Sequence, residues 1–91
     1  AVLGLTKTAA IDYAGKGIRI NAVCPGVIQT AMVDDLIRRN PSLEQVFTKD
    51  IPAGRLGKPE EIADAVLWLS SPQASYMNGQ GLIVDGGITV K

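Results

Sequence analysis

The chain has 91 residues, and its balance of 46% hydrophobic to 20% charged residues indicates a globular core of at most one domain. Nine basic and nine acidic residues cancel, so no charge imbalance favours nucleic acid or an anionic membrane as a partner. The absence of histidine excludes Ser-His-Asp and Cys-His catalysis and removes the commonest metal ligand, so we expect no metal site. A lone Cys24 cannot form an internal disulfide, which favours a reducing, cytoplasmic setting. No apolar run has the length of a membrane span.

The first 14 residues are predicted to form a helix. Apolar side chains recur on two neighbouring faces, so this helix should be buried on two sides. Tyr13 belongs to this pattern and is interpreted as a packing residue. Gly15 is expected to end the helix in the left-handed conformation. Because the sequence starts at Ala1 inside this pattern, without Met, a basic leader or a cleavage site, we expect it to be the later part of a longer chain.

The remaining elements alternate between strand and helix. Residues 18–24 are predicted to form a strand whose apolar second half is typical of the interior of a parallel sheet. Helices are expected at 31–39, 42–49 and 59–70, and a second strand at 82–84. This order is typical of an α/β fold with a parallel sheet. Two strands alone would leave open edges, so more strands are expected upstream.

Two of the predicted helices begin with recognisable signals. Thr30 is a suitable N-cap for the first of them. Pro59 fits the first position of the helix at 59–70, and the acidic pair after it favours the positive end of the helix dipole. Neighbouring acidic residues on a helix do not share a face, so we assign both acidic pairs to solvent or capping rather than to a metal. These pairs are Asp34-Asp35 and Glu60-Glu61.

The most informative stretch is 21–30, where a buried strand meets the turn Pro25-Gly26 and then a helix start at Thr30. In open α/β sheets, ligands bind beyond the carboxyl ends of the strands, and a helix start there offers N–H groups and a positive dipole end. Gly26 lets the backbone approach a ligand closely, and Thr30 adds a hydroxyl. The spacing alone leaves two interpretations open: a ligand-binding corner, or a structural turn followed by a helix cap.

Four stretches resemble short-chain dehydrogenases/reductases in order and spacing, and together they span essentially all of the chain. Residues 18–30 are similar to that family's sixth strand and the Asn-x-x-x-Pro-Gly-x-x-x-Thr loop after it. Residues 4–10 resemble the second half of the helix that bears the family's Tyr-x-x-x-Lys pair. Residues 54–63 resemble the lead into its last long helix, and residues 79–87 resemble its last strand and closing turn.

This resemblance implies a fold and a reaction. The 91 residues would be the C-terminal, incomplete part of one NAD(P)-binding domain, a Rossmann-like doubly wound parallel sheet in a three-layer α/β/α arrangement. The cofactor would be NAD or NADP, and the reaction would be hydride transfer between a small-molecule alcohol and a ketone. The full-length protein would be an oxidoreductase, and this piece would supply nicotinamide contacts, a substrate lid and an oligomer surface.

The resemblance also implies site residues in the loop. The backbone of Ile28 would bind the nicotinamide carboxamide, and Thr30 would bond the carboxamide or a cofactor phosphate. Pro25 and Gly26 would shape the wall beside the ring, with Val27 next to them. These contacts would decide which face of the ring meets the substrate, which is a positioning role.

Most of the family's machinery has no match in these 91 residues, so the catalytic residues are expected upstream of Ala1. The unmatched parts are the glycine-rich turn, the residue that selects NAD or NADP, the catalytic Ser and the Tyr-Lys pair. Tyr13 is not a substitute, because residue 17 is Gly rather than Lys. Lys7 is interpreted as a surface residue, and Asn21 as a structural residue that bonds nearby backbone. The piece alone is therefore expected to be inactive and to bind NAD(H) weakly or not at all.

Other residues lie in regions that the resemblance associates with substrate or subunits. Residues 31–57 match the variable substrate lid, where lid packing and substrate contact both remain open for Met32, Leu36, Ile37 and Phe47. For Trp68, an interface role and a core role are equally favoured. A homo-oligomer, dimer or tetramer, is expected through 59–70 and 82–87, and the alternative function is a non-catalytic subunit-packing fragment. Cys24 is assigned to core packing rather than to a reactive thiol.

Overall fold

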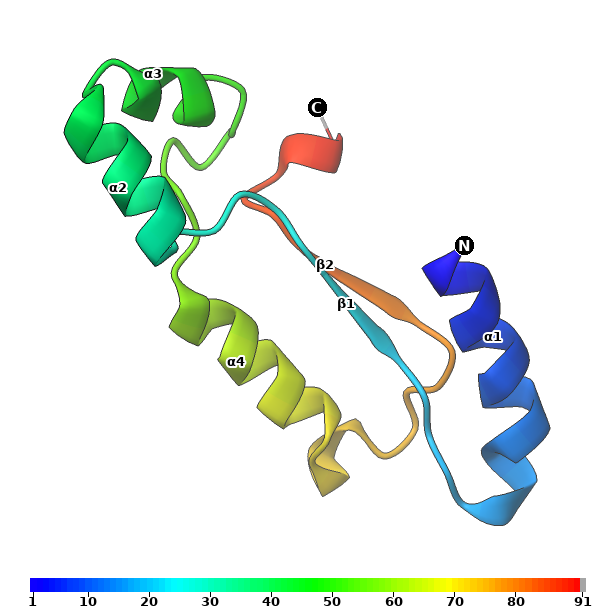
Figure 1. The fold of residues 1–91 in the computed structure, drawn as a ribbon. Helices are drawn as coiled ribbons and strands as arrows, with labels where there is room; N and C mark the ends of the chain where they lie inside the picture. The colour runs from blue at the N-terminus through cyan, green and yellow to red at the C-terminus, as the bar shows by residue number, and fades with distance from the viewer. Residues whose placement is uncertain (91) are drawn as a thin grey trace. The chain divides into compact units, whose positions relative to one another are not determined.

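The computed structural model describes residues 1–90, in which helices and two short strands follow one another along the chain (Figure 1). The α-helices are α1 (Val2–Tyr13), α2 (Ala31–Arg39), α3 (Leu43–Thr48) and α4 (Pro59–Leu69). The strands are β1 (Ala22–Pro25) and β2 (Gly81–Val84). Three short 3₁₀ helices are η1 (Ala14–Lys16), η2 (Pro72–Ala74) and η3 (Ile88–Val90).

The two strands pair with each other and run parallel. The amide of Ala22 donates to Gln80 O at 2.8 Å, and four residues later the amide of Gly26 donates to Val84 O at 3.0 Å. Both partners advance in the same direction along the chain, which is the register of a parallel ladder. The predicted α/β class with a parallel sheet is confirmed.

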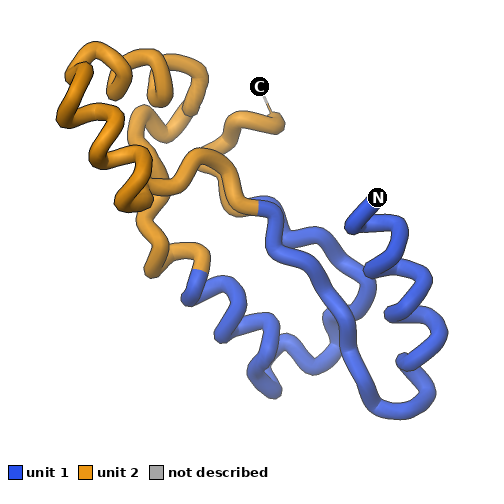
Figure 2. The backbone as a smooth tube through the Cα atoms, in the orientation of Figure 1, with its two compact units in different colours: residues 1–24, 63–83 blue, residues 25–62, 84–91 orange. Residues whose placement is uncertain are grey.

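The chain divides into two compact units, drawn in different colours in Figure 2. Unit 1 comprises Ala1–Cys24 and Ala63–Ile83, and unit 2 comprises Pro25–Ile62 and Val84–Lys91. The boundary falls within β1, within α4 and within β2, so the carboxyl end of each strand belongs to unit 2. The predicted site residues Pro25, Gly26, Val27, Ile28 and Thr30 therefore all lie in unit 2.

Unit 1 has a helix on each side of its strand segments (Figure 2). On one side, a Cβ built on Gly81 would lie 2.5 Å from a methyl carbon of Leu3 and 3.6 Å from the Cys24 sulfur, so α1 packs directly against β2. On the other side, Val23 lines a hollow together with Leu69 of α4. Val23 and Cys24 are consecutive in β1 and face opposite ways, as the pleat of a strand requires. Unit 1 therefore has helix, sheet and helix in layers.

Side-chain amides fasten the entry to β1 in unit 1. Asn78 accepts the Ile20 amide on Oδ1 at 3.0 Å and donates from Nδ2 to Ala10 O at 3.1 Å, which ties α1 to the segment before β1. Asn21 donates to Met77 O at 3.1 Å and accepts the Gln80 amide at 3.0 Å. The structural role expected for Asn21 is confirmed.

The strand begins later than the sequence pattern indicates. Residues 18–24 were expected to pair, yet β1 starts at Ala22. The backbone before Ala22 bonds elsewhere, because the Ile20 amide donates to the Asn78 side chain and Ile20 O accepts the Gly79 amide at 2.8 Å. The glycine assignment was also wrong: Gly17, with φ of 76°, is the left-handed residue, because η1 continues past Gly15 to Lys16.

Helix α1 is covered on one face only within residues 1–90. Thr6 and Ala10 are its buried residues, whereas Val2, Leu5 and Ile11 are 70 to 78% exposed. Tyr13 is 43% exposed, with the Lys16 ammonium 5.5 Å from its ring centre, so its predicted packing role is not seen among the described residues. Among the described residues, no helix combines the length and apolarity needed to cross a membrane.

Candidate functional site

The loop that follows β1 is held against the end of β2. The Gly26 amide donates to Val84 O, and the two backbones approach so closely that a Cβ at Gly26 would lie 2.7 Å from Asp85 Cβ and 2.8 Å from Asp85 Cα. Real Cβ atoms are not found at such distances from backbone atoms. Gly26 is therefore required by a close approach between two strand ends, not by an unusual backbone angle.

A second parallel pairing continues where β1 stops. Ile28 forms a parallel bridge with Gly57, in which the Gly57 amide donates to Val27 O at 3.0 Å and the Gln29 amide donates to Gly57 O at 2.7 Å. In a parallel bridge the central residue turns its own N–H and C=O toward the opposite edge. No hydrogen bond within residues 1–90 uses either group of Ile28. One donor and one acceptor of the backbone thus face away from Gly57, side by side.

Thr30 closes the loop as a helix cap, as predicted. Its side-chain oxygen accepts the Val33 amide at 3.2 Å, and α2 begins at Ala31. The hydroxyl hydrogen is still available for donation to a ligand, because an alcohol oxygen can accept and donate at once. Gln29 adds a hydrogen bond from Nε2 to the Asp34 carboxylate at 3.0 Å, across the first turn of α2. The start of α2 is therefore fixed relative to the loop.

The turn after β2 is organised by Asp85. Its carboxylate accepts the Gly87 amide at 2.9 Å and the Thr89 amide at 3.1 Å. These donors, the Gly87 amide foremost, lower the pKa of Asp85 because they stabilise its charged form. Gly86 and Gly87 both have positive φ. Both also lie close to residues 51–53, so the backbone of the turn packs on that segment.

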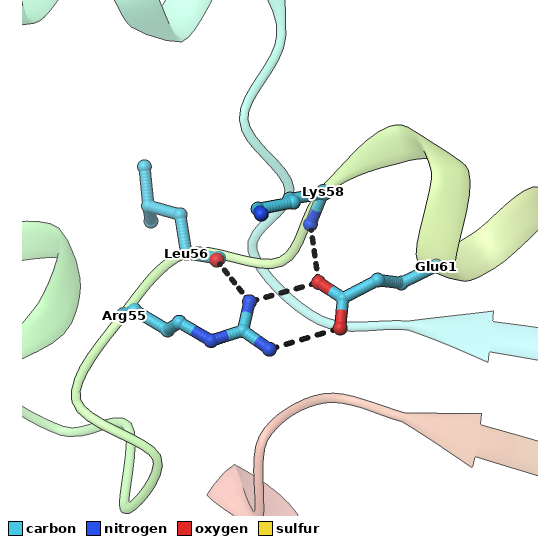
Figure 3. Close-up of polar contacts among 4 residues, drawn as sticks. All are labelled: Arg55, Leu56, Lys58 and Glu61. Carbon is cyan, nitrogen blue, oxygen red and sulfur yellow. Dashed lines mark hydrogen bonds and ion pairs between the residues drawn. The ribbon is translucent and has the colours of Figure 1, made fainter.

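An ion pair holds the segment that carries Gly57 (Figure 3). Arg55 donates from both terminal nitrogens to the two carboxylate oxygens of Glu61, at 2.8 and 2.9 Å, and also to Leu56 O at 3.1 Å. Glu61 in turn accepts the Lys58 amide at 2.9 Å, which caps the start of α4. The Arg55 hydrogen bonds, then the Lys58 amide, lower the pKa of Glu61 to about 2.

A cavity of about 120 Å³ lies beside the loop within unit 2. Its walls come from the loop after β1, from the end of β2 and the turn after it, from the segment around Gly57 and from the first turn of α4. The lining residues are Val27, Ile28, Ala53, Arg55, Gly57, Glu61, Ile62, Val84, Asp85 and Gly86. The loop thus has open space on one side instead of close packing.

The five predicted loop residues run from the end of β1 to the N-cap of α2, but the predicted lid residues are not gathered into one cluster. Met32 is 72% exposed and Leu36 is 41% exposed. Ile37 and Phe47 are half-buried, and Ile37 lines a groove of unit 2 with residues of α3 and of the segment 54–58. The role of the lid residues stays a prediction.

Sequence reasoning missed the contribution of Arg55, and it expected a solvent or capping role for Glu61 without its hydrogen bond to the Lys58 amide. The pattern of Pro59 followed by two acidic residues shows that a helix starts here, and Glu61 at the third position is suited to reach back to the cap amide. No sequence signal pairs Arg55 with Glu61, because the pairing depends on how the loop before the helix turns.

The chain was then compared with known proteins. The family model described as enoyl-(acyl carrier protein) reductase matches residues 1–89. The chain belongs to the short-chain dehydrogenase/reductase family. It is 50% identical over 91 residues to the short-chain dehydrogenase anuF of Penicillium roqueforti, and the match covers 100% of this chain and 33% of that protein. The chain therefore spans about a third of the length of the curated relatives it matches.

Solved structures of the short-chain dehydrogenase/reductase family match it over nearly its whole length. A putative 2-deoxy-d-gluconate 3-dehydrogenase from Agrobacterium tumefaciens with bound NADP is 42% identical, with a TM-score of 0.88 over 99% of this chain and 36% of that one. A 4-hydroxyisoleucine dehydrogenase complexed with NADH is 30% identical, with a TM-score of 0.89 over 99% and 37% of the two chains. The predicted family and its Rossmann-type α/β fold are confirmed.

Proposed function

We propose that this chain supplies one side of the nicotinamide site of an NAD(P)-dependent oxidoreductase that interconverts an alcohol and a ketone. The observation that carries the proposal is the pair of backbone groups on Ile28 that face away from Gly57. A primary carboxamide also presents one N–H donor and one C=O acceptor side by side, so it can pair with a backbone edge as another strand would. The residues present therefore fit the group.

The neighbouring residues complete the proposed site. Thr30 has a hydroxyl hydrogen to donate to the carboxamide oxygen or to a cofactor phosphate, and the start of α2 favours negative charge. Gly26 keeps this part of the wall free of a side chain, and Pro25 and Val27 flank it. Bound NAD or NADP, as in the solved relatives named above, would accept or donate the hydride. The chain's own contribution is to hold one face of the ring toward the substrate.

The proton-transfer chemistry belongs to residues outside these 91. This chain has no histidine, and Tyr13 has no lysine four residues later, so none of the described groups is assigned as the general acid or base. We infer that the 91 residues alone turn over no substrate and bind dinucleotide weakly.

The proposal is tested in the full-length protein that carries this sequence. Absorbance at the reduced-nicotinamide band follows hydride transfer across a panel of secondary alcohols and ketones with NAD and with NADP. Thr30→Val should weaken dinucleotide binding, because it removes the hydroxyl. The matched control is Thr8→Val, whose exposed hydroxyl donates only to Gly4 O at 3.0 Å in α1. Full-length protein that binds neither dinucleotide, or a Thr30→Val variant that binds as the wild type does, would count against the proposal.

A second proposed role is subunit packing. Within unit 1, α4 and β2 expose apolar side chains: Leu67 is 68%, Trp68 is 42% and Ile83 is 54% exposed. Exposed apolar side chains of this size need a covering partner, which either the rest of the domain or a second subunit would supply, so the interface and core roles of Trp68 stay equally favoured. The interface would join copies of the protein as a dimer or tetramer.

Sedimentation velocity tests the subunit-packing role. The full-length protein should sediment as a dimer or tetramer, and Leu67→Glu should shift it toward the monomer because it buries a charge at the interface. Gln73→Glu, at an exposed position of η2, adds the same charge outside the apolar surface and should leave the sedimentation unchanged. A wild type that remains monomeric at high concentration would contradict this role.

A further inference from the structure

We propose that Arg55 is a positioning residue: with Glu61 it holds the segment 55–58 as a rigid edge against which Ile28 is aligned for the carboxamide. This inference rests on the proposed function. Arg55 lies on the far side of the loop from the two free backbone groups of Ile28, because it belongs to the segment that contains Gly57. It would act through the backbone and not by touching the cofactor.

The segment is fixed at both ends by one carboxylate. Arg55 forms two hydrogen bonds to Glu61, and Glu61 also accepts the amide of Lys58. The Glu61 amide donates back to Lys58 O at 2.9 Å. Helix α4 begins at Pro59, directly after Lys58, so the segment 55–58 is joined to a rigid helix end. The Arg55 side chain joins the residues before α4 to Glu61 in that helix (Figure 3).

Gly57 connects the segment 55–58 to the loop that carries Ile28. Its amide and carbonyl bond Val27 and Gln29, the two residues on either side of Ile28. A Cβ at Gly57 would lie 2.7 Å from the Ile28 Cδ1 atom, so the Ile28 side chain lies directly against the glycine. The direction of the Ile28 N–H and C=O is therefore set by where Gly57 lies.

Packing around the loop is incomplete where a cavity borders it. The cavity of about 120 Å³ borders Val27 and Ile28, and both are only half-buried. A loop beside open space has few contacts that resist a shift of several tenths of an ångström. Between the Gly26–Val84 hydrogen bond and the Thr30 cap, the backbone of residues 27–29 is held by the two hydrogen bonds to Gly57, and Arg55 with Glu61 restrains Gly57.

The ion pair is exposed, and this makes the proposal distinguishable from a structural role. The Arg55 and Glu61 side chains are 55% and 39% exposed. Exposed pairs add little to the free energy of unfolding. Removing Arg55 should therefore leave the fold and the melting temperature nearly unchanged, while the loop samples a wider range of positions.

The test measures dissociation constants in the full-length protein for two probes. The first is the reduced dinucleotide that the wild type binds more tightly, NADH or NADPH. The second is ADP-ribose, or its 2′-phosphate for an NADPH-binding protein, which lacks the nicotinamide. Arg55→Met and Glu61→Gln each remove the paired charge, and Glu61→Gln keeps an oxygen that can accept the Lys58 amide. Lys7→Met is the control, because it removes an exposed positive charge from α1.

We expect Arg55→Met to raise the dissociation constant of the dinucleotide two- to fivefold and to leave that of ADP-ribose unchanged. Glu61→Gln should have the same effect, and the double variant should be no worse than either, because the two residues act as one unit. Arg55→Lys should recover part of the loss. Equal weakening of both probes, or no weakening of either, would overturn the positioning role. A wild type that binds ADP-ribose and the dinucleotide equally well would overturn the proposed carboxamide contact itself.

Discussion

Gly26 and Asp85, each the residue directly after a strand, lie so close together that there is space for a hydrogen atom but not for a methyl group on Gly26. The nearest Asp85 atoms are Cβ and Cα, which no side-chain rotation moves, so the contact cannot be relieved in that way. Gly26 lies at the start of the loop that carries Ile28, and Asp85 holds the turn after β2 through its carboxylate. A change at Gly26 therefore affects both the loop and the turn.

Gly26→Ala should destabilise the protein by about 1–3 kcal/mol, the usual cost of forcing an extra carbon into a filled space. The backbone angle is not the cause, because Gly26 has no positive φ. Urea unfolding measures the effect. Gly15→Ala is the matched control, since nothing lies within 4 Å of a Cβ there and its φ is ordinary. Equal stability of the two variants would show that the close contact in unit 2 is not maintained in solution.

Asn78→Ala should cost about 2 kcal/mol, because it leaves the Ile20 amide and the Ala10 carbonyl without their partner in partly buried positions. Asn78→Asp keeps the acceptor for Ile20 and loses the donor to Ala10, so its cost should fall between that of the alanine variant and zero. Asn40→Ala removes an exposed contact with the Ser42 hydroxyl and should change stability by less than about 0.5 kcal/mol. An Asn78→Ala variant as stable as Asn40→Ala would contradict the fastening role.

Thr30→Val should cost about 1 kcal/mol of stability through loss of the helix cap. In the full-length protein it should also weaken dinucleotide binding, because the donor to the carboxamide or phosphate is gone. Thr30→Ser keeps the hydroxyl and should preserve both properties. A serine variant that behaves like valine would mean that the threonine methyl group matters more than its hydroxyl.

The titration of Glu61 offers a direct test of the ion pair. Its pKa in the folded chain is lowered to about 2 from an ordinary value of 4.5, chiefly by the Arg55 hydrogen bonds. A lowered pKa means that the stabilising contribution is complete above pH 4.5 and is lost as the pH falls toward 2. Carboxyl-carbon NMR should show a midpoint near 2 in the wild type and a higher midpoint in Arg55→Met. A wild-type midpoint near 4.5 would show that the pair does not form.

The sequence predicted the order of helices and strands because local chemistry decides it. Thr30 caps α2 and Pro59 opens α4 where the sequence places them, and Asn21 bonds the backbone. Errors arose where residues distant in sequence take over. The Ile20 amide bonds the Asn78 side chain in place of a strand partner, and η1 moves the left-handed glycine from 15 to 17.

At the candidate site, too, local features were predicted from the sequence and contacts between distant residues were not. The turn at Gly26 was recognised from the sequence, but its cause is contact with Asp85, a residue 59 positions later in the chain. The bridge between Ile28 and Gly57 was not expected, because neither residue signals pairing in a stretch that reads as loop. Burial of both faces of α1 was expected from its apolar pattern, and the described residues cover one face.

The central claim is that the backbone of Ile28 pairs with the nicotinamide carboxamide. A crystal structure of the full-length protein with bound NADH or NADPH tests this most directly. The account predicts that the carboxamide nitrogen and oxygen lie within about 3.2 Å of the Ile28 carbonyl oxygen and amide nitrogen, with the Gly57 bridge intact on the other side of the loop. A nicotinamide ring bound elsewhere, or a carboxamide bonded only to side chains while the Ile28 groups stay unpaired, would contradict it.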